Sequence, residues 1–439
     1  MKFTVDSAVF RGAKTTANFN GSILPFEFSD PKTEYLACRE SAWLGCMLSF
    51  APKYIVSGPD SVKLFNKICV NKDFSTMKTG SSKHVLICND NGHLMADGVA
   101  MKTEDGAYHT YFLAPVLHYF LESSGLNVKG EYREEYFFQI DGPKSLEIME
   151  KACQCDLHDI KFAHNKKVTI CGTEMVIHRL GMSGALAYEV HGDPKDAETA
   201  YTRIREVLEE FGGKPQGIRN YPLLNHTPAG YPNQQQHYQY DHMASGSAYA
   251  EFVKKYCIML PMKGSAMGNI ESFYVNPYDI GWGYLVNFDH DFMGKEALMK
   301  VKKNPSKQIV TLEWNPEDIG DVFVSQFRGS NFEPYAPIEY FGSGDGLYPS
   351  INGDYVLAGG KTIGLSTGRT YAFYERRMIS LGIISKEYAQ EGKELKILWG
   401  DPGNPQKEIR VNVVKFPYYN GEFRNESFNT EKIPRPAFK

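Results

Sequence analysis

The chain has 439 residues, of which 42% are apolar and 23% are charged, and this balance excludes a largely disordered protein. Its 48 basic and 52 acidic residues give a formal net charge of −4, so nothing in the charge favours nucleic acid or an anionic membrane as a partner. The length predicts two or three domains.

The start of the chain and its cysteines indicate where the protein resides. Residues 1–21 contain no continuous apolar stretch, so we expect no signal peptide. No run of about 18 apolar residues occurs, so we expect no transmembrane helix. Eight cysteines are too few for a disulfide scaffold and fit reduced thiols. We therefore expect a cytoplasmic protein; the sequence does not indicate its oligomeric state.

Two segments repeat one pattern. Residues 53–68 and 137–152 each predict a strand, a Gly-Pro corner and a helix. Pro59 and Pro143 suit the first turn of a helix, where a missing N–H does no harm. An antiparallel meander and a further helix follow each segment. The predicted elements are strands 84–88, 94–102 and 108–113 with helix 116–123, and strands 168–171, 174–180 and 186–191 with helix 197–210.

This repetition predicts a duplicated α+β unit with a cleft at the junction of its two copies. Residues 213–250 break the pattern, and the polar and aromatic stretch 233–240 is either a surface loop or a segment that covers a site. Beyond residue 307 the composition favours strands, at 309–314, 361–365, 378–384, 395–399 and 408–414. We expect two parts: a duplicated α+β region, 1–305, and a C-terminal β-barrel or sandwich, 306–439.

Several motifs for metal or nucleophilic chemistry are absent or incomplete. The histidines are scattered without His-Glu-x-x-His, and Cys153 and Cys155 lack a second matching pair, so we expect ordinary thiols and no metal site. Residues 364–368 match Gly-x-Ser-x-Gly, but a strand-like segment follows where a hydrolase elbow needs a helix. Residues 342–346 are interpreted as a turn. Without a dinucleotide fingerprint, we expect neither flavin nor haem.

Two acidic residues occupy matching places in the two meanders. Asp97 lies among apolar neighbours in a predicted strand, and Glu189 lies at the equivalent place in the second copy. A carboxylate in such surroundings needs a partner or a shifted pKa. Either both side chains point into one central cleft, or each lies on the solvated face of its strand.

These residues resemble the aminomethyltransferase (glycine-cleavage T-protein) superfamily of tetrahydrofolate-binding enzymes. The similarity covers nearly the whole chain and depends on Asp97, Glu189 and the segments 56–60, 276–283 and 288–298. Segments 217–221, 269–277 and 374–382 are most similar to the tetrahydrofolate-dependent aromatic O-demethylases of the vanillate, syringate and 3-O-methylgallate type. The resemblance implies a T-protein-like cloverleaf: two related α+β units and a C-terminal β-barrel-like domain around a central folate channel.

The resemblance also assigns residues to the folate. Glu189 matches the glutamate that binds the N–H and amino groups of the pterin, and Asp97 matches the aspartate near the reacting folate nitrogens. Phe162 matches the aromatic residue that packs on the pterin. Tyr111 is also expected to contact the folate. Tyr231 takes the place of a tryptophan, with one residue inserted.

The substrate side of the pocket differs from the O-demethylase pattern. Tyr221 matches the tyrosine that hydrogen-bonds the ether oxygen. Phe50 replaces a histidine, Met47 a glutamine, Phe28 a tyrosine, and Leu113 the arginine that holds a substrate carboxylate. All four changes make the pocket more apolar, so we expect a neutral guaiacol-like or lignan-like ether, as found among lignin-derived compounds.

The expected reaction is transfer of the methyl group of an aryl methyl ether to folate N5, giving 5-methyltetrahydrofolate and a phenol or catechol. Tyr221, with an ordinary pKa of about 10, would assist the leaving phenolate as acid or hydrogen-bond donor, and Asp97 is the second candidate catalytic residue. Two alternatives remain: a related methyl- or aminomethyltransferase of the superfamily acting on N-methyl, sulfonium or glycine-derived groups, and a non-catalytic folate-binding protein.

Overall fold

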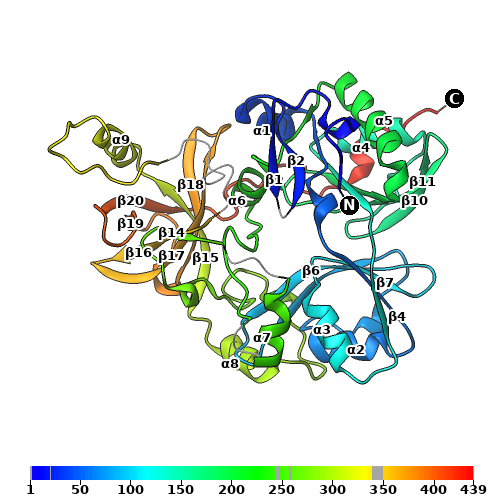
Figure 1. The fold of residues 1–439 in the computed structure, drawn as a ribbon, viewed down its shortest axis with the longest axis horizontal. Helices are drawn as coiled ribbons and strands as arrows, with labels where there is room; N and C mark the ends of the chain where they lie inside the picture. The colour runs from blue at the N-terminus through cyan, green and yellow to red at the C-terminus, as the bar shows by residue number, and fades with distance from the viewer. Residues whose placement is uncertain (1, 20, 243–246, 257–259, 339–349, 439) are drawn as a thin grey trace.

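The computed structural model describes residues 2–19, 21–242, 247–256, 260–338 and 350–438 (Figure 1). Its helices and strands form two α+β units side by side and a β-barrel beside them. This α+β architecture agrees with the predicted fold class. The glycine-rich stretch 342–346, interpreted above as a turn, lies outside the described residues.

The first unit contains a five-stranded sheet in the order β5-β6-β7-β4-β8. Helices α2 (Ser61–Ile68) and α3 (Val116–Ser123) supply Leu64, Phe65 and Leu117 to the apolar core on one face of this sheet. The strands are β4 (Lys53–Ser57), β5 (Ser82–Cys88), β6 (Leu94–Lys102), β7 (Tyr108–Tyr111) and β8 (Lys129–Tyr132).

The second unit has a six-stranded sheet in the order β10-β11-β12-β9-β3-β13. Helices α4 (Ser145–Cys153) and α5 (Ala197–Glu210) cover one face and share a core with Tyr188 and Val190 of the sheet. The strands are β3 (Trp43–Gly45), β9 (Tyr136–Asp141), β10 (Asn165–Ile170), β11 (Thr173–His178), β12 (Ala187–Gly192) and β13 (Lys214–Pro215).

The repeated strand–corner–helix pattern is present in both units, as β4–α2 and β9–α4. Gly58 and Gly142 stand at the two corners with φ of +112° and +145°, values that L side chains rarely adopt. A Cβ on Gly142 would lie 2.2 Å from Ser41 O, and one on Gly58 would lie 2.8 Å from Asn127 O. Both corners therefore need glycine for conformation and for space.

Six strands close the barrel because β16 pairs with β17 on one side and with β19 on the other. Strand β16 was not predicted from the sequence. The strands are β15 (Lys307–Trp314), β16 (Ile351–Ala358), β17 (Lys361–Ala372), β18 (Arg377–Ser385), β19 (Glu394–Trp399) and β20 (Lys407–Val414), and β14 (Met262–Lys263) adds to β16 in parallel.

The remaining segments connect and cover these three parts. They include the hairpin of β1 (Thr15–Phe19) and β2 (Ser22–Glu27), and helices α1 (Pro31–Glu40), α6 (His226–Ala229), α7 (Ser247–Lys254), α8 (Lys295–Lys303) and α9 (Pro316–Ser325). Within the described ranges, no helix combines the length and the apolar character needed to cross a bilayer.

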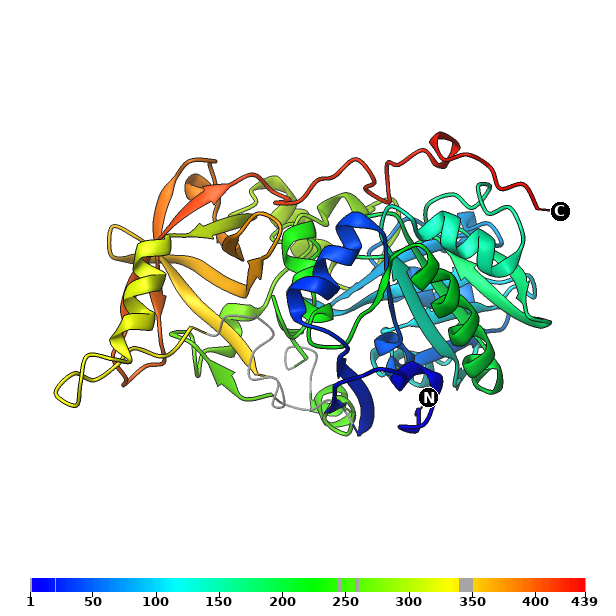
Figure 2. The same cartoon turned by 90° about the horizontal axis from the view of Figure 1, so that it is seen from above.

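The end of the chain leaves the barrel and returns to the second unit (Figure 2). Phe428 and Ile433 pack into the core beneath α4 and α5. Arg179 donates hydrogen bonds to Asn425 Oδ1 and to the backbone oxygens of Asn425 and Phe428. The segment after residue 414 therefore joins the barrel to the second unit, and the division at residue 305 stays a prediction.

Candidate active site

The face of the second sheet opposite α4 and α5 carries polar side chains in one row. Glu189 of β12 stands opposite His178 of β11 and opposite Gln139 of β9. Directly opposed residues in antiparallel strands point to the same face, and Asp141 shares that face two residues beyond Gln139. All four side chains are buried, so this face is an acceptor-rich surface shielded from bulk water.

Two histidines hold the Glu189 carboxylate. His178 Nδ1 lies 3.1 Å and His191 Nε2 lies 3.5 Å from the same oxygen, Oε2. Burial opposes ionisation, but the two imidazoles outweigh it, and the pKa of Glu189 is lowered from its ordinary value. Oε1 has no hydrogen-bond partner among the described residues, so it is free to accept from a ligand.

Asp97 of β6 is surrounded by three donors. Its Oδ1 accepts from the hydroxyls of Tyr238 and Tyr240, the latter at 2.6 Å, and its Oδ2 lies 3.3 Å from His84 Nε2. Burial alone would raise the pKa of Asp97, but His84 and the two tyrosines outweigh it and lower the pKa. Asp97 is therefore held as a carboxylate. The tyrosines come from the stretch 233–240, so its surface-loop interpretation is wrong.

The barrel fixes these tyrosines through His237. The His237 backbone oxygen accepts from Thr367 Oγ1 at 3.0 Å, and its ring nitrogen Nε2 lies 2.9 Å from Thr227 Oγ1. The imidazole packs against Gly368, where a Cβ would lie 2.2 Å from Nε2. The Gly-x-Ser-x-Gly stretch therefore continues as strand β17, as predicted, and its last glycine provides the room for His237.

Tyr221 lies close to the row that contains Glu189. Its ring packs edge-on against Trp43 at 6.1 Å and His226 at 5.5 Å between centroids. Trp43 stands opposite Asp141 in the second sheet. Burial, followed by the charges of Asp141 and Glu189, raises the pKa of Tyr221 well above its ordinary value, so the phenol stays protonated. Its hydroxyl makes no hydrogen bond to a described residue.

Several predicted site residues meet in one apolar cluster between the two sheets. Met47, Phe50, Phe162 and Tyr111 pack in the same cluster as Tyr221. Tyr111 reaches across from β7 of the first unit to the His191 ring of the second, with centroids 4.8 Å apart. The chain thus brings aromatic and aliphatic side chains from both units together beside Glu189.

Three predicted residues lie outside this central cluster. Leu113 is fully buried in the core of the first unit, and Phe28 packs beneath the guanidinium of Arg205 at 5.6 Å. Tyr231 lies beneath Arg424, whose guanidinium carbon is 4.7 Å from the ring centroid. The roles assigned to these three stay predictions.

The sequence did not single out several polar residues of the site. Tyr238 and Tyr240 lie in the stretch 233–240, which was predicted to be a surface loop or a segment that covers a site, but neither residue was named. His84, Gln139 and Asp141 have no local pattern that distinguishes them from other strand residues. Burial raises the pKa of Asp141 well above its ordinary value. Buried atoms of this site without a hydrogen-bond partner among the described residues include Gln139 Oε1, Asp141 Oδ1 and His226 Nε2.

Two groups of side chains have the composition of metal ligands. His178, Glu189 and His191 form one, and Glu150, Asp156 and His158 form the other, each with ligand atoms within 4.8 Å of one another. In each group one imidazole already lies at hydrogen-bond distance from a carboxylate, His178 from Glu189 and His158 from Glu150 and Asp156, which accounts for the arrangement without an ion. The sequence prediction of no metal stays a prediction.

The fold defines the class of protein: a T-protein-like cloverleaf of two α+β units and a β-barrel. The glycine cleavage aminomethyltransferase T structure from Bartonella henselae matches 93% of this chain and 95% of its own at a TM-score of 0.68 and 15% identity, which shows the shared fold. The profile of the GCVT N-terminal domain matches residues 6–252.

Relatives extend the similarity to the whole chain. A sesamin methylene transferase of Sinomonas sp. (strain No.22) is 42% identical over 99% of this chain and 98% of its own length. A syringate O-demethylase of Sphingobium sp. (strain NBRC 103272 / SYK-6) is 27% identical over 90% of each chain. An aminomethyltransferase of Thermotoga petrophila is 24% identical over 94% of this chain and 96% of its own. The chain belongs to the GCVT family, the T-protein superfamily, and the expected family is confirmed.

Proposed function

We propose that this protein is a tetrahydrofolate-dependent transferase that takes a one-carbon group from an aryl ether, and that this group is the methylene bridge of a methylenedioxyarene. The observation that carries the proposal is the convergence of Glu189 and Tyr221 on one apolar cluster between the two units. The 42% identity to a sesamin methylene transferase favours a methylene bridge over a methyl group.

The second sheet presents adjacent hydrogen-bond acceptors, which the edge of a pterin that carries its donor groups requires. That edge carries an N–H and an amino group side by side, and it needs adjacent acceptors. Glu189 Oε1 has no described partner, and Gln139 Oε1, on the neighbouring strand, is buried and unpartnered. Glu189 and Gln139 would therefore hold the pterin, with Phe162 and Tyr111 as its apolar surroundings.

Tetrahydrofolate would supply two nucleophilic nitrogens, N5 and N10. In the overall reaction both C–O bonds of the methylenedioxy bridge break and two C–N bonds form. The hydrogens of the two nitrogens end on the two arene oxygens, giving a catechol and 5,10-methylenetetrahydrofolate. Oxidation states are conserved, so the reaction needs no oxidant or reductant.

The chain's own groups would manage the protons. Tyr221 is protonated and its hydroxyl is free among the described residues, so it would donate a hydrogen bond to an ether oxygen as charge develops there. Because its pKa lies well above 10, it would act chiefly as a hydrogen-bond donor rather than as a matched acid. Asp97 would accept a proton from a folate nitrogen. General acid–base assistance of this kind contributes about 10²–10⁴-fold.

The apolar residues of the central cluster favour a neutral arene as the substrate. Met47 and Phe50 contribute apolar surface to the central cluster. Leu113, which stands where carboxylate-binding relatives are expected to have arginine, lies in the core of the first unit and offers no cation to the central cluster. A charged carboxylate beside Met47 and Phe50 would lose hydration without a cation to replace it.

A second candidate is O-demethylation of a methoxyarene, which gives 5-methyltetrahydrofolate. The 27% identity to a syringate O-demethylase favours it, and Tyr221 would assist the leaving oxygen in the same way. The aminomethyl-transferring and non-catalytic alternatives would not require the Tyr221 hydroxyl.

The test is incubation of the purified protein with tetrahydrofolate and a panel of arenes: a methylenedioxyarene such as sesamin, and methoxyphenols with and without a carboxylate. We expect 5,10-methylenetetrahydrofolate and a catechol from the first substrate. Formation of 5-methyltetrahydrofolate from a methoxyphenol alone would establish the second candidate. Tetrahydrofolate binding without turnover of any ether would contradict both.

A further inference from the structure

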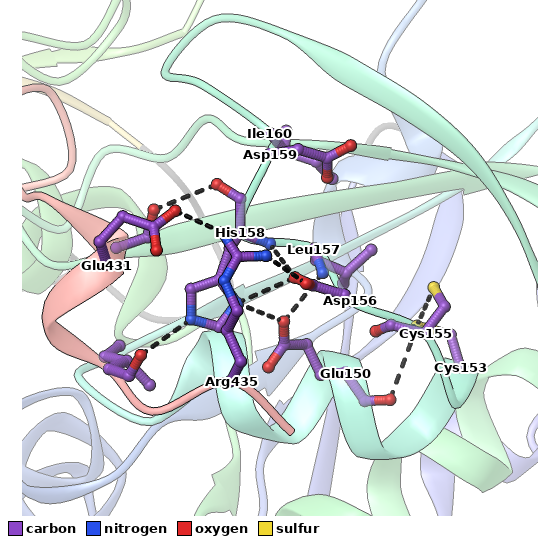
Figure 3. Close-up of polar contacts among 12 residues, drawn as sticks. Glu150, Cys153, Cys155, Asp156, Leu157, His158, Asp159, Ile160, Glu431 and Arg435 are labelled. Carbon is purple, nitrogen blue, oxygen red and sulfur yellow. Dashed lines mark hydrogen bonds and ion pairs between the residues drawn. The ribbon is translucent and has the colours of Figure 1, made fainter. Parts of the chain in front are cut away.

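Outside the candidate active site, two cysteines lie in contact at the end of helix α4. Cys153 is the last residue of the helix, and Gln154 after it adopts the left-handed conformation, with φ +54° and ψ +39°. This turn folds Cys155 back, so that the two Sγ atoms lie 3.2 Å apart (Figure 3). A left-handed residue at this position is a common way for a helix to end, and here it brings Cys155 back toward the last turn of α4.

The two thiols differ in exposure. Cys153 is buried, with 8% of its surface exposed, whereas Cys155 is only half-buried. An oxidant in solvent therefore reaches Cys155 first and finds a second sulfur already beside it. An accessible cysteine next to a resolving cysteine is the arrangement typical of reversible thiol oxidation.

The residues that follow Cys155 hold the end of the chain. His158 Nε2 lies 3.0 Å from the Ile433 oxygen, and the His158 oxygen accepts from Thr430 Oγ1 at 3.2 Å. Asp156 forms an ion pair with Arg435, which also contacts Glu431 at 2.5 Å. Figure 3 shows these contacts around the His158 ring.

Leu157 and His158 are held in place, so they cannot shift when Cys155 moves toward Cys153. Leu157 is fully buried, and its N–H donates to Glu150 Oε1 at 2.8 Å. The same oxygen lies 2.8 Å from His158 Nδ1. Closing the sulfur–sulfur distance from 3.2 Å to the roughly 2.05 Å of a bond would therefore displace mainly Asp156, the half-exposed residue between Cys155 and Leu157.

We propose that Cys153 and Cys155 are a redox-sensitive pair which hydrogen peroxide converts to a disulfide, and that this disulfide loosens the C-terminal segment 430–435 by withdrawing Asp156 from Arg435. The Cys155 sulfur attacks peroxide, the O–O bond breaks, and a sulfenic acid and one water form. The Cys153 sulfur then attacks the sulfenic sulfur, the S–S bond forms, and the second water leaves. Two thiols are oxidised and one peroxide is reduced.

The first test treats the whole protein with hydrogen peroxide, blocks free thiols and digests it with trypsin. Peptide 152–161 contains both cysteines and no other. We expect this peptide to lose two hydrogens, to resist thiol blocking and to recover on reduction with dithiothreitol. The exposed Cys171 serves as the internal control for an isolated thiol. Oxidation of Cys171 while peptide 152–161 keeps both free thiols would overturn the pair.

The second test follows the C-terminal segment in the intact protein. Lys432 is exposed, so brief trypsin treatment reports opening there as loss of residues 433–439. We expect oxidation to make this cleavage several-fold faster in the wild-type protein and to leave it unchanged in Cys155→Ser and Cys153→Ser. Two variants are used because a serine at the buried position 153 can impair folding. Equal acceleration in wild type and Cys155→Ser would overturn the coupling.

Discussion

Asp97 and Tyr240 exchange two hydrogen bonds: the Asp97 N–H donates to the Tyr240 hydroxyl at 3.0 Å, and that hydroxyl donates to Asp97 Oδ1 at 2.6 Å. The two residues are 143 positions apart, so the contact joins the first α+β unit to the segment that leads toward the barrel. It fixes the position of the Asp97 carboxylate and helps to keep it ionised.

Removing the Tyr240 hydroxyl should shift the acid side of the pH–activity profile. The donors around Asp97 lower its pKa, so Tyr240→Phe raises that pKa and the carboxylate is lost at a higher pH. A hydrogen bond to a charged group is worth about 1.5–3 kcal/mol, and one pKa unit is 1.36 kcal/mol, so the shift should be about 1–2 pH units.

The measurement is kcat/KM for one-carbon transfer over a pH range that extends below 3.8, the ordinary pKa of an aspartate, because the pKa of Asp97 lies below it. Tyr374→Phe is the control, because this exposed tyrosine lies on the surface. An unchanged acid limb in Tyr240→Phe would show that Asp97 does not act as a base in the reaction.

Gly368→Ala should displace the His237 imidazole from the position in which it packs against residue 368. The added Cβ would lie 2.2 Å from His237 Nε2, and the residue has φ of +60°. Left-handed strain costs about 1–2 kcal/mol and overpacking a further 1–3 kcal/mol. Displacement of His237 also moves Tyr238, so turnover should fall with stability.

Gly359→Ala is the matched control for this substitution. Gly359 has nearly the same φ, +55°, and nothing lies within 4 Å of its added Cβ. Denaturant melts of the two variants separate backbone strain from the clash. Equal losses of stability would show that the space beside His237 is unimportant.

Much of the fold follows from local pattern, and most of the site does not. The strand at 94–102 and the helices at 116–123 and 197–210 have the predicted bounds, because each has a clear period and a turn or capping signal. Strand β16 was missed since its sequence begins Ile-Asn-Gly-Asp, which is typical of a turn.

The site depends on contacts that no local pattern contains. The duplication predicted equivalent places for Asp97 and Glu189, and this is wrong: Asp97 lies on β6, the second strand of its meander, whereas Glu189 lies on β12, the third. The partners of both residues lie outside their own strands. Tyr238 reaches Asp97 across 141 positions, and the His178 that holds Glu189 is set by strand register. A single sequence carries no signal for such pairings.

Glu189→Gln should weaken tetrahydrofolate binding while preserving the shape of the site. The amide keeps one acceptor oxygen but loses the charge that His178 and His191 stabilise. Loss of a charged hydrogen bond predicts a roughly 10- to 100-fold higher Kd. Calorimetric titration with tetrahydrofolate measures it.

Glu174→Gln is the control for this variant, because Glu174 lies in the neighbouring strand with its side chain 72% exposed. Its affinity should equal that of the wild type. If Glu189→Gln binds tetrahydrofolate as tightly as the control, Glu189 does not hold the pterin.

The stability of the protein should fall as the pH drops below 6.5, in part through His237. Burial lowers the pKa of His237 to about 3, from an ordinary value of 6.5. Between these values the unfolded chain binds a proton that the folded chain does not, so protonation favours unfolding. From pH 6.5 to pH 5 the loss from this residue is about 1.6 kcal/mol, because the slope rises from half of 1.36 kcal/mol per pH unit at pH 6.5 to nearly the full value at pH 5.

Chemical denaturation at pH 7, 6 and 5 compares the wild-type protein with His237→Gln, whose side chain cannot gain this proton. The variant should be less stable at pH 7, because the contact with Thr227 is altered, and its stability should depend less steeply on pH. Burial also lowers the pKa of His226, to about 4, so part of the dependence should remain in the variant. If the stability of the two proteins depends on pH with the same slope, His237 takes up its proton in the folded state without cost. Its imidazole would then not be confined as the contact with Gly368 requires.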